Sequence, residues 1–334
     1  MSEVSTETAE LLIEKTSIGE TINVHQSINS DDDRKINTQS DYLFKAQRWH
    51  ALWVSNLIPL AGFIAGVVLA FYWGVGWLEV GMLFVMYFLT IMGVEVGFHR
   101  FFSHKSFEAS KTLTVILGAL GSMVAQGPVI YWCANHRRHH KHADKKGDPH
   151  SPHAEGNQRY GGLKGLWYAH VVWQMHSKTP NSAYFTKDLL KIPLVRWINK
   201  TYFLWLILGV LLPAAVGFLI TWDYKGAVIG FIWGGLGRLF LVNHFTYTVT
   251  SVCHVIGKQP FKTTEHSRNN WFLSIPTFGQ AWHNNHHAFP YSAVVNFKWW
   301  QIDLGGMMIR IFKGLGMASN LKIPPQEMIY RKQQ

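Results

Sequence analysis

Eight histidines fall into three short clusters, and their imidazoles are the side chains most able to do chemistry. The clusters are HRFFSH with His99 and His104, HRRHH with His136, His139 and His140, and HNNHH with His283, His286 and His287. Neutral imidazole binds iron, copper, zinc or nickel, and ordinary packing does not require three histidines within five residues. With 18 histidines in 334 residues, chance gives an HxxHH string roughly 0.05 times per chain. The spacing therefore predicts a metal site.

Helical geometry lets each cluster present its histidines together. Residues at i, i+3 and i+4 of an α-helix lie within about 100° of arc, so each HxxHH string can offer three ligands from one face. His99 and His104 are five residues apart, about 140° round a helix, which predicts that His99 lies on a helix and His104 just past its end. Eight imidazoles exceed the needs of one four-coordinate zinc, and no CxxC or HExxH string accompanies them. Two metals are predicted, with iron favoured and zinc left open.

The elements that must position these histidines are membrane helices. The chain is 48% hydrophobic and only 15% charged, against about 25% charged in soluble proteins. Its mean hydropathy is +0.03, so the apolar residues are concentrated in a few segments. Crossing a hydrocarbon core of about 30 Å takes roughly 20 residues, and four segments are long enough: about 51–73, 76–98, 202–222 and 226–249. Very short turns, 74–76 and 223–225, predict two hairpins.

The positive charges predict the orientation in the membrane. Of the 31 Lys and Arg residues, 29 lie before the first hairpin, between the two hairpins or after the second one. These three regions are on the same side of the membrane. Cytoplasmic loops are rich in Lys and Arg, so both termini and the histidine clusters are predicted to be cytoplasmic. The net charge of +11 indicates anionic membrane lipid as a partner, since no nucleic-acid recognition motif accompanies it.

The predicted fold is an all-α integral membrane protein, with four transmembrane helices in two hairpins and a helical cytosolic cap that holds a histidine-rich dimetal site. A fifth apolar stretch, Leu113–Cys133, is predicted to be partly embedded, because a crossing would separate HRRHH from HRFFSH. Five regions follow: 1–45, a disordered acidic cytosolic tail; 46–100, the first hairpin; 101–201, cap with the interfacial segment; 202–249, the second hairpin; 250–334, the rest of the cap.

Longer strings around the clusters carry a family resemblance. GPVIYWCANHRRHHKHADKKGDPHSP from Gly127 and WHNNHHAFPYS from Trp282, with the box series HxxxxH, HxxHH and HxxHH, resemble the membrane fatty-acid desaturases, nearest the acyl-CoA Δ9 (stearoyl-CoA) type. The resemblance covers roughly residues 45–315. It implies four membrane helices, a cytosolic cap with two irons, and an acyl tunnel beneath the metals. It also implies a ninth ligand, His254 in TSVCH, where the family has an NSxxH-like string.

Two positions depart from the family pattern. Thr250 stands where the family usually has Asn, whose amide reaches one iron through water, so Thr250 is expected near the second metal. Ala134 and Asn135 precede HRRHH where animal acyl-CoA enzymes carry Arg-Asp that grip CoA. The acyl carrier, CoA or membrane lipid, therefore stays open.

The resemblance also assigns residues around the metals and along the tunnel. Gln126, Trp132, Thr246 and Tyr247 match tunnel positions, with plain packing as the alternative. Asp144, Asp148 and His150 form a DxxxDPH string, and their expected role is to orient ligand imidazoles, which usually donate their second N–H. Glu95, one turn before His99, is expected to do the same or to be an interfacial carboxylate. Arg238, inside the fourth span, is expected to form a structural pair.

The function predicted from these residues is an O₂-dependent fatty acyl desaturase that introduces a cis double bond, expected at Δ9, by means of two iron ions. No GxGxxG string or haem-binding HPGG string is present, so a separate electron donor is expected, of ferredoxin or cytochrome b5 type with its reductase. Two alternatives stay open: a membrane di-iron hydroxylase or alkane monooxygenase, and a histidine-rich metal transporter or sensor. Bond position, chain length and oligomeric state are not fixed by the sequence.

Overall fold

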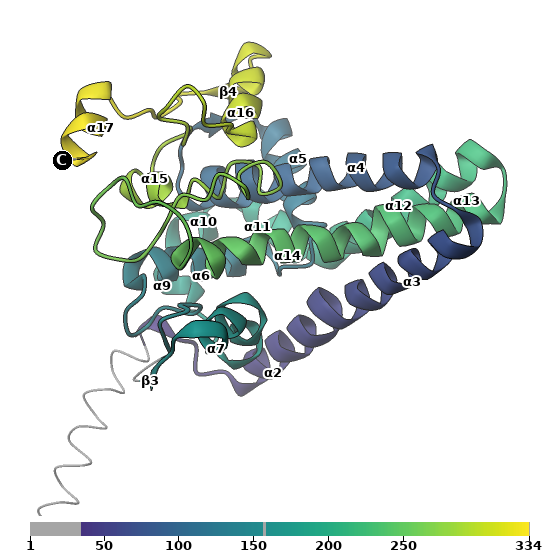
Figure 1. The fold of residues 1–334 in the computed structure, drawn as a ribbon, viewed down its shortest axis with the longest axis horizontal. Helices are drawn as coiled ribbons and strands as arrows, with labels where there is room; N and C mark the ends of the chain where they lie inside the picture. The colour runs from purple at the N-terminus through teal and green to yellow at the C-terminus, as the bar shows by residue number, and fades with distance from the viewer. Residues whose placement is uncertain (1–34, 156–157, 334) are drawn as a thin grey trace, which may run out of the picture.

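The computed structural model describes residues 35–155 and 158–333, and long helices dominate it (Figure 1). Within this part of the chain, four helices are long and apolar enough to cross a membrane. They contain 33, 27, 20 and 31 residues: Asp41–Trp73, Trp77–Ser103, Tyr202–Thr221 and Tyr224–His254. About 20 residues at a rise of 1.5 Å span the hydrocarbon core. The predicted helical membrane fold with four spanning helices is confirmed, and three of the helices are long enough to continue into the cap.

Each long helix except the third is built from several segments. The first comprises α2 (Asp41–Trp49), a π-helical stretch His50–Leu57 and α3 (Ile58–Trp73). The second is α4 (Trp77–Met92) followed by π-helical Gly93–Ser103, and the third is α12 (Tyr202–Thr221). The fourth comprises α13 (Tyr224–Ile229), π-helical Gly230–Gly237, α14 (Arg238–Thr250) and the 3₁₀ turn Val252–His254. The π-helical stretch Gly93–Ser103 contains His99 and directly precedes His104, and π-bulges are often found at functional sites.

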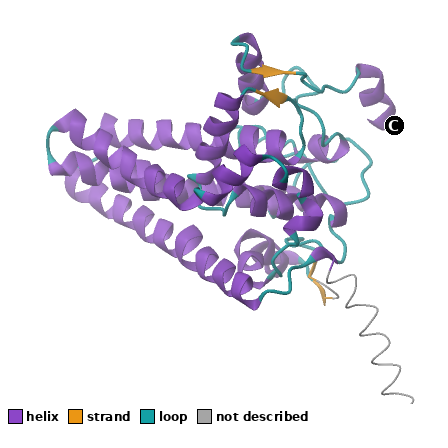
Figure 2. Ribbon diagram, turned by 180° about the vertical axis from the view of Figure 1, so that it is seen from behind, coloured by secondary structure: helices purple, strands orange, loops and turns teal. Residues whose placement is uncertain are grey.

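The third and fourth helices form a tight pair. Trp222 adopts a left-handed conformation at the turn, with φ of 53°, and Asp223 caps α13 by accepting from the Lys225 N–H at 3.2 Å. A Cβ on Gly217 would lie 2.0 Å from the Gly226 carbonyl oxygen, so only glycine allows this approach of the two backbones. In contrast, α3 packs against Gly230–Gly237 and diverges from α4 (Figures 1 and 2).

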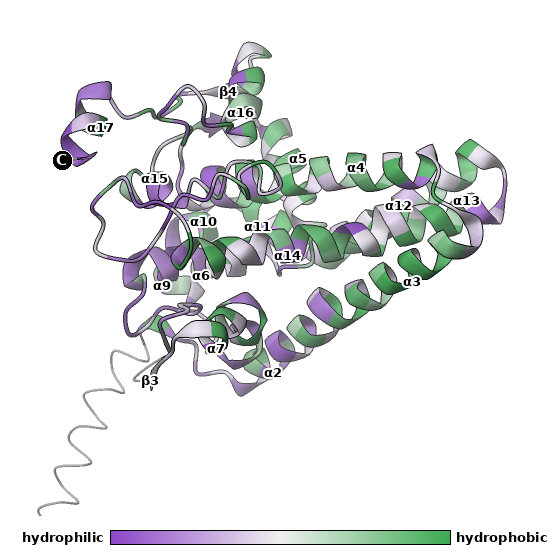
Figure 3. Ribbon diagram, viewed as in Figure 1, coloured by the Kyte–Doolittle hydropathy of each residue, from purple (hydrophilic) through white to green (hydrophobic). Residues whose placement is uncertain are grey.

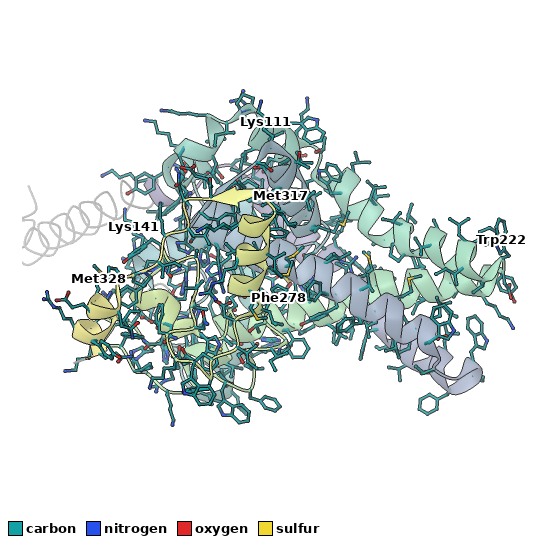
Figure 4. All side chains as sticks on the ribbon, turned by 90° about the horizontal axis from the view of Figure 1, so that it is seen from above. Lys111, Lys141, Trp222, Phe278, Met317 and Met328 are labelled. Carbon is teal, nitrogen blue, oxygen red and sulfur yellow. The ribbon has the colours of Figure 1, made fainter. Side chains whose placement is uncertain are left out.

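The cap lies at the end of the long helices opposite Trp222. Figure 4 labels Trp222 at one tip of the molecule and Lys141, next to the histidine cluster of α6, near the other. Figure 3 shows mainly hydrophobic colours along the long helices, and hydrophilic residues gather around α6, α15 and α17. All three histidine clusters therefore belong to one end of the molecule, as the sequence predicts.

The cap is assembled from short helices and two small antiparallel sheets. After the first pair of long helices come β1 (Glu108–Ala109), α5 (Lys111–Ser122), α6 (Val129–His142), β2 (Ala154–Glu155), β3 (Gln158–Arg159), α7 (Gly162–Trp167), π-helical Tyr168–Val172, α8 (Trp173–His176), α9 (Ser182–Phe185), α10 (Lys187–Leu190) and α11 (Pro193–Lys200). After the fourth long helix come α15 (His283–Ala288), α16 (Leu304–Gly314), β4 (Ala318–Ser319) and α17 (Gln326–Gln333). β1 pairs with β4, which ties the two parts of the cap together.

The fifth apolar stretch is divided into two helices. α5 has 12 residues, or about 18 Å of helix, too short to cross a hydrocarbon core. It ends at Ser122, and α6 begins after Pro128. Arg238 of α14 donates to the Met123 carbonyl at 2.7 Å, and also to the carbonyls of Gly209 and Gly234. The expected structural pair is thus wrong in one respect, because the acceptors of Arg238 are backbone carbonyls and include the C-terminus of α5.

The predicted disordered tail of residues 1–45 is too long. α2 begins at Asp41, with Ser40 as its N-cap accepting from the Leu43 N–H at 3.3 Å and an acidic residue in the first turn. The preceding residues also make tertiary contacts, since the Thr38 N–H donates to the Thr179 carbonyl at 2.9 Å. Residues 1–34, which make up the rest of that prediction, lie outside the described residues.

Candidate metal centre

The nine histidines predicted as ligands lie together where four segments of the chain meet. His99 lies on the second long helix and His104 directly follows it, as the five-residue spacing predicts. The others come from α6, from the turn after α14, and from α15. Their ring nitrogens form two groups, each with all members within 4.8 Å of one another. The first group is His99, His104, His136, His140 and His286, and the second group is His139, His254, His283 and His287.

Each HxxHH string contributes to both groups. In α6, His136 and His140 belong to the first group and His139 to the second. In α15 the division is reversed, because the i, i+4 pair His283 and His287 belongs to the second group while His286 belongs to the first. On an α-helix, residues i and i+4 lie on nearly the same side, whereas residue i+3 is rotated from residue i by about 60° in the opposite sense. Two facing helices with this pattern can therefore build two adjacent sites.

Within each group the Nε2 atoms face one another at short range. The Nε2 of His286 lies 3.0 Å from that of His99 and 2.8 Å from that of His140. In the second group, the Nε2 atoms of His254 and His283 are 3.0 Å apart. Facing lone pairs repel unless a proton or a cation lies between them. The burial and the convergence of these nitrogens fit one metal ion in each group.

Carboxylates fix which nitrogen of several rings carries the proton. Glu95 lies 2.6 Å from Nδ1 of His99. Asp148 lies 3.0 Å from Nδ1 of His139, and Asp144 lies 2.9 Å from Nδ1 of His254. An ionised carboxylate only accepts, so each Nδ1 is the protonated donor and each Nε2 presents its lone pair to the site. Glu95, Asp144 and Asp148 therefore each lie beside a histidine of one of the two groups, and their orienting role stays a prediction.

Glu265 is a fourth carboxylate near the histidines, and no sequence pattern predicts it. Its Oε1 lies 3.6 Å from Nδ1 of His287, and its side chain is buried. Glu265 also accepts from the Ser267 hydroxyl at 2.8 Å. It lies in an irregular segment with no helical spacing to any histidine, so only the fold brings it to the second group.

The electrostatics keep six of the nine predicted ligands in the neutral form that binds metal. Burial, and then the neighbouring imidazoles, lower the pKa well below the usual range for six of the nine histidines: His104, His136, His140, His283, His286 and His287. Burial opposes ionisation of Asp148, but the adjacent His139 outweighs it and lowers the pKa of the carboxyl to about 2. Six neutral imidazoles together with the ionised Asp148 carboxylate suit a divalent or trivalent cation.

His150 and Thr250 are both predicted beside the metals, and they have different partners in the structure. His150 lies against the second group, with its ring 4.3 Å from that of His139 and its Nδ1 3.7 Å from Asp148. Burial lowers the pKa of His150 to about 3. The Thr250 hydroxyl donates to the carbonyls of Ala169 and Tyr247, at 2.9 and 3.1 Å, so its hydroxyl hydrogen is directed at backbone.

Glu95 also connects the first group to α16. Its Oε1 accepts from Nε of Arg100 at 2.8 Å, and Arg100 forms a bidentate pair with Asp303 at 2.9 and 2.7 Å. Asp303 caps α16 by accepting from the Gly306 N–H at 2.9 Å. All three charged side chains are buried, so each charge depends on its partners. This network holds His99 against the cap.

Replacing Glu95 by Gln is expected to lower iron affinity about 10- to 100-fold with the fold retained. A carboxylate accepts from both His99 and Arg100, whereas an amide must present its NH₂ to one of these donors. Competition with a chelator measures the affinity. Glu327→Gln, on the exposed face of α17, is the matched control, and equal affinity in the two variants would contradict this role.

An apolar cavity of about 690 Å³ leads to the histidines. Its inner wall includes His99, His136, His139 and His283. Exposed residues at its outer end come from α2, α9 and the start of α12: Tyr42, Leu43, Ala46, Ala183 and Phe203. The volume is within the roughly 300–1,000 Å³ of small-molecule sites. The cavity thus connects the protein surface with both metal groups.

The residues predicted for the tunnel line this cavity. Gln126, Trp132, Thr246 and Tyr247 all contribute to its wall, as does Thr250. Trp132 stacks on His136 with ring centroids 5.1 Å apart, and its Nε1 donates to Oε1 of Gln126 at 2.8 Å. The Gln126 amide in turn donates to Asn243 at 3.2 Å. This network fixes the cavity wall beside the first group.

Comparisons with known proteins agree with this arrangement. The family model described as fatty acid desaturase matches residues 76–304. The chain is 42% identical over 88% of its length to a hex-5-enoyl-[acyl-carrier protein] acetylenase of Moorena producens, covering 92% of that protein. It is 36% identical to an sn-1 stearoyl-lipid 9-desaturase of Synechocystis sp., covering 77% of this chain and 76% of the relative. It is 33% identical to an acyl-CoA C20 Delta5-desaturase of Anemone leveillei, covering 83% and 82%.

Proposed function

Because this chain belongs to the fatty acid desaturase family, we propose that it is an O₂-dependent enzyme that converts two adjacent methylenes of an acyl chain to a cis double bond. The observation that carries the proposal is the position of both histidine groups at the inner end of an apolar cavity. The overall reaction consumes O₂, two electrons and two protons, removes two hydrogens from the chain, and releases two water molecules. Two iron ions bound by the nine histidines would supply the oxygen-activating redox chemistry.

The protein's own residues hold and shape this site. The nine imidazoles would hold the two iron ions through the nitrogens that face one another, and Glu95, Asp144 and Asp148 keep the protons of His99, His254 and His139 on the opposite nitrogens. The cavity wall excludes water and holds a methylene chain against the histidines, with Trp132 and Gln126 beside the first group. A flexible chain gains reactivity from being held in one geometry.

Δ9 specificity and the acyl carrier are parts of the proposal that need their own test. The relatives' names specify position 9 on a lipid, position 5 on a CoA ester, and an acyl-carrier-protein substrate. We expect the double bond at Δ9 from the sequence resemblance, on an acyl-CoA or an acyl-lipid. A separate ferredoxin or cytochrome b5 type donor, with its reductase, is expected to deliver the electrons.

A second candidate is oxidation of an existing double bond to a triple bond. The acetylenase of Moorena producens, with 42% identity over 295 residues, favours it. The same site and cavity serve either outcome, because each removes two hydrogens from adjacent carbons. The two reactions differ in the acyl chain that fills the cavity.

Expression in a host that lacks its own aerobic desaturase tests the proposal. New monounsaturated chains that appear only with O₂ and an electron donor support it, and mass spectrometry locates the double bond. Alkynes after feeding of unsaturated chains would support the second candidate. Hydroxylated chains without alkenes would instead indicate a hydroxylase, and an unchanged lipid profile would contradict the proposal. Assays with CoA-bound and lipid-bound chains identify the carrier.

We further propose that both histidine groups and both termini are cytoplasmic. The distribution of 31 Lys and Arg residues supports this orientation. In intact cells, Lys225→Cys is expected to react with a membrane-impermeant thiol reagent and Lys145→Cys is not. Both positions are exposed, whereas native Cys133 and Cys253 are buried, so labelling reports the introduced thiol. The reverse labelling pattern would overturn the orientation.

A further inference from the structure

Two neighbouring hydrogen-bond donors in the cavity wall have no partner within the described part of the protein. They are Nε2 of Gln174 and Nε1 of Trp173, both on α8. Both side chains line the cavity, and Gln174 is only 7% exposed. A buried donor without an acceptor costs free energy relative to water. Two such donors among the residues that line the cavity indicate that the bound ligand brings an acceptor to them.

The orientation of the Gln174 amide is set by its surroundings. Its Oε1 accepts from the Tyr247 hydroxyl at 3.3 Å and from Nδ2 of Asn56 at 3.4 Å. Asn56 cannot be turned round, because the same Nδ2 donates to the Ala51 carbonyl at 2.7 Å. The oxygen of Gln174 is thus occupied by donors, and Nε2 is left free.

One of these donors, on Trp173, lies near the second group of histidines. The Trp173 ring is 5.0 Å from that of His150, and the His150 ring is 4.3 Å from that of His139. Gln47 of α2 donates to the Gln174 backbone carbonyl at 3.0 Å, which ties α8 to the first long helix. Trp173 therefore lies towards the second group, and the buried Gln174 side chain follows it on α8, beside the first long helix.

We propose that Gln174, together with Trp173, binds the acyl carbonyl of the substrate and so sets the position of the new double bond. This inference rests on the proposed function. An acyl chain is apolar except for its ester or thioester carbonyl, whose oxygen has two lone pairs and can accept from both donors. A carbonyl held at a fixed place in the cavity determines which methylenes reach the histidines. The bond position is then counted from the carbonyl end, whatever the chain length.

Gln174→Met tests the proposal, because methionine is unbranched and of similar length but has no N–H. We expect one double-bond position in the wild-type products of saturated acyl chains of several lengths. In the variant we expect a mixture of neighbouring positions and a KM raised roughly tenfold, with unchanged iron content. Gln326→Met, an exposed position on α17, is the control and should match the wild type. Mass spectrometry of the products gives the positions.

A single unchanged position together with an unchanged KM in iron-loaded Gln174→Met would overturn the proposal. If that variant does not fold or bind iron, Trp173→Phe, which removes the second donor and keeps an aromatic ring, decides in the same way. A mixture of positions from it upholds the proposal and an unchanged product refutes it. If the wild-type chain makes no desaturated product, the proposed function fails and this inference fails with it. Product from the wild type with no change in either variant refutes this inference alone.

Discussion

His286→Ala is expected to abolish desaturation and to deplete the first group of its metal. The Nε2 of His286 lies within 3.0 Å of those of both His99 and His140, so its removal opens the centre of the five-histidine group. Loss of a group that only orients a ligand already costs about 10- to 100-fold in affinity or activity, and loss of the ligand itself should cost at least about 100-fold. Product yield and iron content per chain measure the effect.

The same loss is expected from alanine at each of the other clustered histidines: His99, His104, His136, His139, His140, His283 and His287. Membrane insertion should persist, because the substitutions leave the apolar residues of all four spans unchanged, and His99 lies close to the end of its span. His176→Ala, an exposed histidine outside both groups, is the control for removing an imidazole. Near-normal turnover in two or more of the eight variants would refute the proposed ligand set.

His254→Ala is expected to lower bound iron and activity together, with the loss confined to the second group. His254 is fully buried, its Nε2 is 3.0 Å from that of His283, and its Nδ1 is 2.9 Å from Asp144. Removing the ring takes away one of four nitrogens and also leaves the Asp144 carboxylate without its main partner. Iron should therefore fall toward half of the wild-type content.

His266→Ala is the matched control for His254. The His266 backbone N–H also donates to Asp144, at 2.9 Å, but its exposed ring belongs to neither group. Full iron occupancy in an active His254→Ala protein would leave a site of eight histidines.

Local patterns explain which features the sequence could predict. The apolar runs are long enough to identify all four spanning helices, and the i, i+3, i+4 spacing identifies the ligand-bearing faces of α6 and α15. His254 has no neighbouring histidine, and only the resemblance of TSVCH to a family string singled it out. The division of the histidines into groups of five and four depends on how α15 packs against α6, which spacing alone cannot give.

Features set by long-range contacts were not predictable. Glu265 and the Arg100–Asp303 pair meet the site across long stretches of sequence. The sequence predicts a structural pair for Arg238, yet its acceptors are backbone carbonyls. Met123 lies at the end of α5, and the Gly209 carbonyl has no helical donor because Pro213 lacks an N–H. The sequence does not show that Gln174 lines a cavity, or that its Nε2 has no acceptor within the described part of the protein. In each case the residue type is ordinary and the tertiary environment gives it a role.

X-ray diffraction from the active protein at the iron absorption edge tests the central claim most directly. Two anomalous peaks are expected in each chain. One should lie among His99, His104, His136, His140 and His286, and the other among His139, His254, His283 and His287. A single iron peak, or peaks away from these nitrogens in protein that still desaturates acyl chains, would contradict it.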